Sequence, residues 1–364
     1  MAIVATLVKE AGVTFREWAE QYGGILCYKS LFNSQIIHLA DPEAIHHVFN
    51  THAYQYLKPD RVIRVMDPGC RQVTSSYYSK IPLRHNQVRL RVARSIDKAV
   101  RQIVCQKRDR MALEKNDGKD LLSMIRASES SGNGMLTDDD LRAQIKNLLA
   151  AGNDTSLVAV TWMLHILSTR PKVQSRPRQE FLAHIGRPTD KTSSSTFNYD
   201  ALHALPYLNI CIKELFRFIP PVAYTSRVAS QDDNVLGYDI PKGTEIQLMS
   251  GGEDAEEFKP ERWMDPSSFS EEDQQSINFV TPDMLWADMP FLTGPRSCIG
   301  SKVALIETKV NLYPVLPLID LEYTPVPGFT FKTSVRITVR PSPGMNLIVK
   351  RFEHDASVNP ITPH

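Results

Sequence analysis

The chain has 364 residues, 42% of them hydrophobic, and its 42 Lys and Arg nearly balance 41 Asp and Glu. The hydrophobic content supports a large buried core, and the charge balance argues against nucleic acid as a partner. Five widely separated cysteines, none in a CxxC pair, argue against a disulfide framework or a cysteine zinc site and for a reducing compartment.

The first 60 residues are predicted to mix α and β structure. FREWAEQYGG, residues 15–24, is typical of a helix that ends at a Gly-Gly pair, and ILCYKSLF and SQIIHLA then alternate like paired strands. DPEAIHHVFN, from residue 41, predicts a short helix opened by Asp and Pro. The apolar MAIVATLV at the start is too short to cross a bilayer, so the chain as written is expected to be soluble. Residues 67–85 are rich in turn formers and are assigned to no element.

Apolar residues recur at spacings of three and four between 84 and 115, which predicts an amphipathic helix. Its other face carries ten Lys or Arg against three acids. Such a face is either simply solvated or a docking surface for an acidic partner or a lipid headgroup layer.

A second long helix is predicted from Thr137, with Asp140 completing its N-terminal cap, to residue 167. AGNDTS, residues 151–156, interrupts this pattern with poor helix formers. The segment is either a turn between two helices or a local distortion. In the second case Gly152 would let a ligand approach, and Asp154 and Thr155 would suit proton delivery in a buried pocket.

The next predicted helix, LPYLNICIKELFRF, places Glu214 and Arg217 on one face and is stopped by Pro220-Pro221. Apolar neighbours favour burial of the pair, which then needs a further partner, and Arg262 in FKPERW is a candidate. Composition does not change across 189–196, which favours a surface loop and one domain over 1–364.

Short strands and turns dominate after Pro220, a helix is expected from about 301 to Tyr313, and closing strands from 321 to 350. Just ahead of that helix lies FLTGPRSCIG, residues 291–300. Cys298 there meets the unpaired N–H groups of a helix start, which favour a thiolate. Gly294 and Gly300 permit tight turns and close approach to a flat ligand, and Arg296 offers a fixed positive charge. Taken alone, such a cysteine is usually an inert hydrophobic residue.

FLTGPRSCIG matches the haem-binding signature F-x-x-G-x-R-x-C-x-G of the cytochrome P-450 monooxygenases at every defining position, beginning with Phe291. AGNDTS resembles the oxygen-activation motif of that family, and the E-x-x-R pair with PERW resembles its charged triad. The resemblance runs from about residue 84 to 350, extends to FREWAEQYGG and HLADPEAI, and is fungal or generally eukaryotic in style.

The resemblance implies a mainly α (α+β) cytochrome P-450 fold and heme b as cofactor. It implies Cys298 as axial ligand of the haem iron, Arg296 and Arg227 as partners of the haem propionates, and Gly152, Asp154 and Thr155 on the oxygen side. Glu214, Arg217 and Arg262 are expected to hold the fold around the cysteine loop.

Two departures accompany the resemblance. Near residues 68–85, helices that the family carries are missing. Near residues 249–254, strand and turn residues that the family carries are missing as well. Members also usually begin with an anchor helix in the endoplasmic-reticulum membrane, and the chain as written has none, which leaves its location unknown.

The expected activity is insertion of one oxygen atom from O₂ into an apolar small molecule, as in secondary metabolism. No G-x-G-x-x-G pattern is present, so a separate NADPH-dependent reductase is the expected electron donor. The alternatives are a haem-binding remnant or incomplete gene product without catalysis, and a haem-thiolate isomerase or dehydratase, which the presence of Asp154 and Thr155 disfavours.

Overall fold

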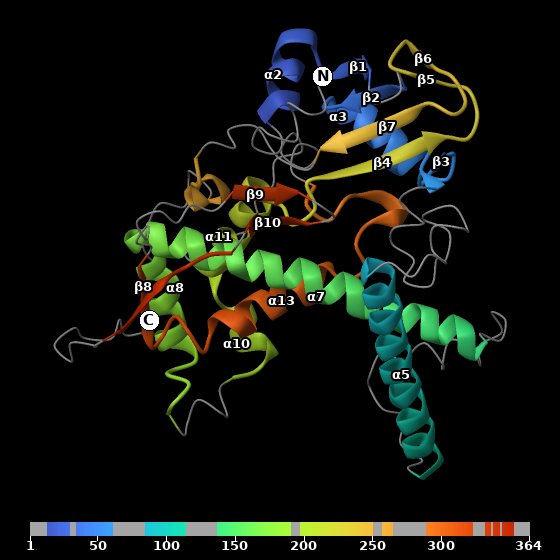
Figure 1. The fold of residues 1–364 in the computed structure, drawn as a ribbon. Coiled ribbons are helices and arrows are strands. Elements are labelled where there is room, and N and C mark those ends of the chain that lie inside the picture. The colour runs from blue at the N-terminus through green and yellow to red at the C-terminus, as the bar shows by residue number, and fades with distance from the viewer. Residues whose placement is uncertain are drawn as a thin grey trace. The chain divides into compact units, whose positions relative to one another are not determined.

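The structure is a computed structural model that divides into two compact units, residues 1–57 with 154–364 and residues 58–153. The longest helix, α7 (Asp138–Thr169), contributes to both (Figure 1). The residues that the structure describes are 13–29, 34–60, 84–113, 137–190, 197–249, 257–264, 289–322, 332–335, 338–342 and 344–352.

The N-terminal elements of the larger unit follow the predicted pattern. Helix α2 (Val13–Tyr22) ends at Gly23, whose φ of +95° suits glycine. Strands β1 (Ile25–Lys29) and β2 (Gln35–Leu39) pair antiparallel. Helix α3 (Pro42–His46) is capped by the Asp41 carboxylate, which accepts a hydrogen bond from the Ala44 N–H at 2.9 Å. It continues into the π-helix η2 (His47–Thr51).

A five-stranded sheet joins this segment to residues far along the chain. The strand order is β1-β2-β7-β4-β3, with β3 at Tyr56–Leu57, β4 at Tyr224–Ala229 and β7 at Glu245–Met249. Only the pairing of β2 with β7 is parallel in this sheet. A hairpin of β5 (Asp233–Val235) and β6 (Tyr238–Ile240) extends from it.

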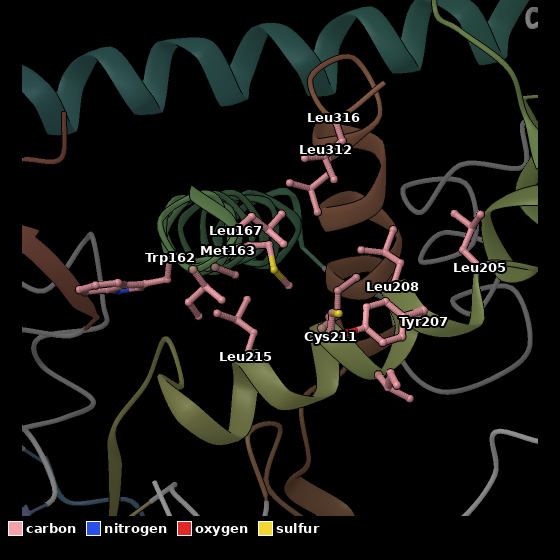
Figure 2. Packing of buried hydrophobic residues seen from close by; sticks show 14 of the residues in the cluster. Trp162, Met163, Leu167, Leu205, Tyr207, Leu208, Cys211, Leu215, Leu312 and Leu316 are labelled. Carbon is pink, nitrogen blue, oxygen red and sulfur yellow. The ribbon is translucent and has the colours of Figure 1, made fainter. Parts of the chain in front are cut away.

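Helices supply the main hydrophobic core of the larger unit, and Figure 2 shows how they meet. The C-terminal part of α7 packs there with α8 (Pro171–His184), α10 (Tyr199–His203), α11 (Pro206–Phe218) and α13 (Ser301–Leu312). Met163, Leu167, Leu208, Leu215, Leu312 and Leu316 are each no more than 1% exposed. Helix α8 continues through Pro177, and α13 stops just before Tyr313, as expected.

Short elements complete the unit. Two 3₁₀ turns, η4 (Pro260–Trp263) and η5 (Gly294–Arg296), carry parts of the expected motifs. The closing strands are β8 (Ile319–Glu322), β9 (Lys332–Val335), β10 (Val339–Ser342) and β11 (Ile348–Arg351). β9 pairs with β10 and β8 with β11, both antiparallel.

The smaller unit is built on α5 (Arg84–Leu113), the predicted basic helix, and the start of α7. Val100 and Val104 of α5 bury against Leu141 and Ile145 of α7. The predicted cap is present, because the Thr137 Oγ1 accepts from the Asp140 N–H at 3.1 Å and the Asp140 carboxylate accepts from the Thr137 N–H at 3.0 Å. Within the described part of the chain, no helix combines the length and apolar character needed to cross a bilayer.

The predicted mainly α (α+β) class is confirmed, and one of the two alternatives for residues 151–156, a turn between two helices, is excluded. Helix α7 passes through AGNDTS without a break or turn. Gly152 costs about 1 kcal/mol relative to Ala in a helix, whereas the next turns bury Val158, Ala159 and Trp162 at 4% exposure or less. Burial of this face outweighs the poor local propensity. Most of the expected gap near 68–85, most of that near 249–254 and the core of the 189–196 loop fall outside the described residues.

Candidate functional site

The cysteine loop presents its thiol to solvent. Cys298 is exposed and lies two residues before the N-cap of α13, Gly300. The Cys298 N–H donates to the Phe291 carbonyl at 2.8 Å, which closes the loop. Phe291 packs edge-on against Phe216 of α11, with ring centroids 5.0 Å apart. The loop is therefore anchored on the helical core while its sulfur stays accessible.

The two glycines of this loop have different reasons to be glycine. Gly294 has a φ of +73°, and a Cβ there would lie 2.2 Å from the Phe49 carbonyl oxygen of η2. Both the backbone angle and the close approach therefore require glycine. A Cβ on Gly300 would only touch the Cys298 sulfur at 3.9 Å. No contact among the described residues therefore demands glycine at 300, which is also the N-cap of α13.

Two arginines meet beside the loop. Arg227 of β4 is 3% exposed, and its Nη1 donates to the Thr225 hydroxyl and the Ser226 carbonyl, both at 2.9 Å. Burial, together with the positive charge of Arg296, lowers the pKa of Arg227 to about 10. Arg296 donates to the Tyr56 carbonyl at 3.2 Å.

Neither arginine forms an ion pair with a carboxylate in the described part of the chain. Burying a positive charge near a second one, with no acid to offset it, is unfavourable. The arrangement is typical of a site for a ligand that brings its own anionic groups.

Glu214 lies at the centre of a buried charge network. Its carboxylate accepts from Arg217 Nε at 2.9 Å and Nη2 at 2.8 Å, and from Arg262 Nε at 3.0 Å. The Lys259 N–H and the Trp263 indole also donate to it, at 2.7 and 2.9 Å. Glu214 is 0% and Arg217 3% exposed. The three expected residues are in contact, and the network ties α11 to η4.

Asp154 and Thr155 lie half-exposed in α7, and Gly152 is exposed. The Asp154 carboxylate accepts from the Thr338 hydroxyl at 2.8 Å and pairs with Arg340 at 2.6 Å. A Cβ on Gly152 would meet nothing within 4 Å. The contacts of Asp154 therefore lead to the strand region 338–340. Among the described hydrogen bonds, none joins Asp154 to the cysteine loop.

Sequence reasoning missed several contributors. Three aromatic residues contact the two arginines. The Arg227 guanidinium lies 4.8 Å from the centroid of the Phe49 ring, and the Arg296 guanidinium lies 5.5 Å from that of the Tyr54 ring. Arg296 also donates to the Tyr56 carbonyl. No local pattern near residue 50 signals a partner more than 170 residues away. Trp263, by contrast, stands beside Arg262 in PERW and could have been included with the triad.

A helix-rich fold with small sheets, an accessible cysteine at a helix start and two arginines without an acidic partner among the described residues agree with the family that the sequence motifs resemble. The sequence profile of the family described as Cytochrome P-450 matches residues 71–347. The chain belongs to the cytochrome P-450 family.

Curated relatives agree with this assignment. The chain is 30% identical to the cytochrome P-450 monooxygenase FUM15 of Gibberella moniliformis over 64% of its own length and 45% of that protein. It is 32% identical to the cytochrome P-450 monooxygenase sphH of Aspergillus fumigatus, over 66% and 44%. It is 32% identical to the ganoderic acid synthetase of Ganoderma lucidum, over 68% and 50%. The chain thus spans about half the length of the curated relatives it matches.

The residues present fit the haem that the family implies. Haem carries two propionates, and the structure offers the charges of Arg227 and Arg296 with no acid of their own. Its iron takes a thiolate in this family, and Cys298 is an accessible free cysteine. These observations concern the protein side alone and define no position for the ring.

Proposed function

We propose that the chain is a haem-thiolate monooxygenase that inserts one oxygen atom from O₂ into an apolar small molecule. The observation that carries the proposal is the buried Arg227 beside Arg296, without an acid, next to the loop that presents Cys298. Heme b, when bound, supplies reductive activation of O₂. The protein's own residues bind and orient it, exclude water and deliver protons.

Cys298 would hold the haem iron as a thiolate, because the helix start behind it favours the anion. Arg227 and Arg296 would each pair with a propionate, which removes their mutual repulsion. Phe291 and Gly294 would keep the loop in place through the Phe216 contact and the close approach to Phe49. Gly300 would leave room beside the sulfur.

Asp154 and Thr155 are the proposed proton donors. Gly152, which has no side chain, would let a ligand approach the helix beside them. The bonds from Thr338 and Arg340 hold the Asp154 carboxylate in one orientation. For a proton relay, the Asp154 carboxylate would leave these two bonds and rotate, with the Thr155 hydroxyl next to it in the chain. Glu214, Arg217 and Arg262 have a structural role here, since they tie together the elements behind the loop.

Electrons are proposed to come from a separate NADPH-dependent reductase, and the basic face of α5 is a candidate docking surface for it. The names of the fungal relatives, among them ganoderic acid synthetase, favour a substrate from secondary metabolism.

The first prediction tests the axial ligand by spectroscopy. Purified, haem-loaded wild-type protein, reduced under CO, should give the absorption band of a thiolate-ligated complex. Cys298→Ala should lose the band, whereas Cys27→Ala and Cys105→Ala, which alter two other exposed cysteines, should keep it. A thiolate-type complex in the Cys298 variant would end the proposal. The same band without any turnover would favour the second reading, a haem-binding remnant, for a chain that spans half of its relatives.

The second prediction tests proton delivery. Thr155→Ala should bind haem normally and still consume reducing equivalents, but release more peroxide per product, because O₂ cleavage consumes two protons. Asp154→Asn should slow O₂ consumption itself, with losses on the order of 10²–10⁴-fold. Peroxide, product and O₂ are measured together, with Thr161→Ala on the same helix as control. Unchanged ratios in both variants would show that AGNDTS serves only the helix.

A further inference from the structure

Three potential metal ligands meet outside the cysteine loop, in the larger unit. They are His47 of the π-helix η2, His52 directly after it, and Asp233 at the start of β5. One ligand atom from each lies within 4.8 Å of the others. The two histidines follow α3 in the chain, and Asp233 begins the β5–β6 hairpin. Figure 1 shows α3 and this hairpin in the same part of the unit.

The π-helix is what brings the two histidines together. The His52 N–H donates to the His47 carbonyl at 2.8 Å, a bond across five residues. The imidazole rings consequently stack, with centroids 4.0 Å apart and an interplanar angle of 28°. In a regular α-helix, residues five apart point in directions about 140° apart. π turns are rare and frequently mark functional sites.

Asp233 supplies the negative charge. Its Oδ2 accepts from His47 Nε2 at 2.9 Å and from the Tyr56 hydroxyl at 2.7 Å. A carboxylate oxygen is a ligand type that zinc accepts beside imidazole nitrogens.

The contacts leave one nitrogen unused. His52 Nδ1 is shielded from solvent and has no hydrogen-bond partner among the described residues. The side chains of His47 and Asp233 are 22% and 16% exposed, so an ion can enter from solvent. A structural hydrogen-bonded tie would need only His47, Asp233 and Tyr56, and it gives no reason for the stacked second imidazole.

We propose that His47, His52 and Asp233 bind a divalent transition metal ion of the zinc type, with solvent as fourth ligand. Two imidazoles and one carboxylate form a donor set that Zn²⁺ accepts, at about 2.0–2.2 Å per ligand and so about 3.3 Å between ligands. The 2.9 Å contact between His47 Nε2 and Asp233 Oδ2 is close to this spacing, and the His52 ligand atom lies within 4.8 Å of both. Tyr56 keeps its bond to the carboxylate and orients it. The proposal does not depend on haem binding.

The test is titration of the purified full chain with Zn²⁺ in competition with a chromophoric chelator. In wild-type protein, the cluster should bind one equivalent of Zn²⁺. In His52→Phe and in Asp233→Asn, this binding should be absent or at least ~10-fold weaker, because loss of even an outer-shell partner commonly lowers metal affinity this much. His52→Phe keeps the ring stack, and Asp233→Asn keeps an acceptor for Tyr56. His46→Ala, which removes an exposed neighbouring imidazole, is the matched control and should bind like wild type.

The exposed thiols of Cys27, Cys105 and Cys298 can also bind zinc, but they are present in every variant. The difference in zinc binding between wild type and variant therefore reports on the cluster alone. Circular dichroism of each variant, with zinc and with EDTA, checks that the fold is retained. If wild type and the two cluster variants bind the same number of zinc ions with equal affinity, the cluster is a hydrogen-bonded tie and the proposal is overturned.

Discussion

At the scale of single residues, the structure contains buried charges that other protein groups neutralise and a buried charge that no described acid neutralises. Glu214 belongs to the first kind, because all five of its described donors are protein groups. Arg227 belongs to the second kind, because its described hydrogen bonds reach only neutral oxygens. A buried charge therefore has a different meaning according to which groups neutralise it.

The third prediction concerns Glu214. Glu214→Gln should leave Arg217 as an uncompensated buried charge and lower the free energy of unfolding by ~3–5 kcal/mol. Burial alone would raise the pKa of Glu214, but hydrogen bonds from Arg217, Lys259 and Trp263 outweigh it and lower the pKa. The network therefore stabilises the fold at neutral pH, and this contribution is lost as pH falls below the unfolded value of 4.5 through the folded pKa.

Urea unfolding at pH 7 and pH 4 measures both effects. The variant should yield little soluble, haem-loaded protein and should depend less on pH than wild type in this acid range. Glu20→Gln on the exposed face of α2 is the control and should change neither quantity. Full haem loading with only slower turnover in Glu214→Gln would assign the residue to the chemistry instead.

At the scale of elements, periodic patterns predicted the long helices α5, α7 and α11, the cap at Thr137 and the strand pairs near the N-terminus. These succeed because each depends on residues close in sequence. Of the two alternatives for residues 151–156, the turn between two helices is absent, since local propensity there is outweighed by burial of the following turns. The π turn at 47–51 and the contacts of Phe49 and Tyr56 were missed, because they are set by pairing with β4 and by the approach of Gly294.

The fourth prediction follows from the continuity of α7. Gly152 lies in a regular helix, is exposed, and a Cβ there meets nothing within 4 Å. Gly152→Ala should therefore raise the free energy of unfolding by ~0.5–1 kcal/mol, the helix-propensity difference. Denaturant unfolding measures the change. Gly23→Ala, at a φ of +95°, is the contrasting control and should destabilise the protein. If Gly152→Ala folds normally but does not bind haem, glycine is required at this position for ligand binding instead.

At the scale of the whole molecule, a ligand site can be built at the expense of the stability of the empty protein. Arg227 is buried, faces the charge of Arg296 and has a pKa lowered to about 10 by these two causes. The unfolded chain hydrates both guanidinium groups, so their proximity opposes folding. A ligand with two carboxylates removes this cost, and its binding then adds to stability by mass action.

The fifth prediction therefore has opposite signs in the empty and the loaded protein. Without haem, Arg227→Met should raise the thermal midpoint and the free energy of unfolding by about 1 kcal/mol or more, because an unpaired buried charge is replaced by an apolar chain of similar length. With haem, the same variant should bind at least ~10-fold more weakly, because one charged partner of the propionates is lost.

Haem titration and thermal unfolding of the same samples measure both signs. Arg227→Lys, which keeps the charge, should retain most of the haem affinity, and Lys242→Met at an exposed turn should alter neither quantity. Haem should stabilise wild type by ~2.7 kcal/mol when present at 100 times its dissociation constant, and stabilise Arg227→Met less at the same concentration. If Arg227→Met destabilises the empty protein and binds haem as tightly as wild type, the arginine serves the sheet through its bonds to Thr225 and Ser226, and the anionic ligand must lie elsewhere.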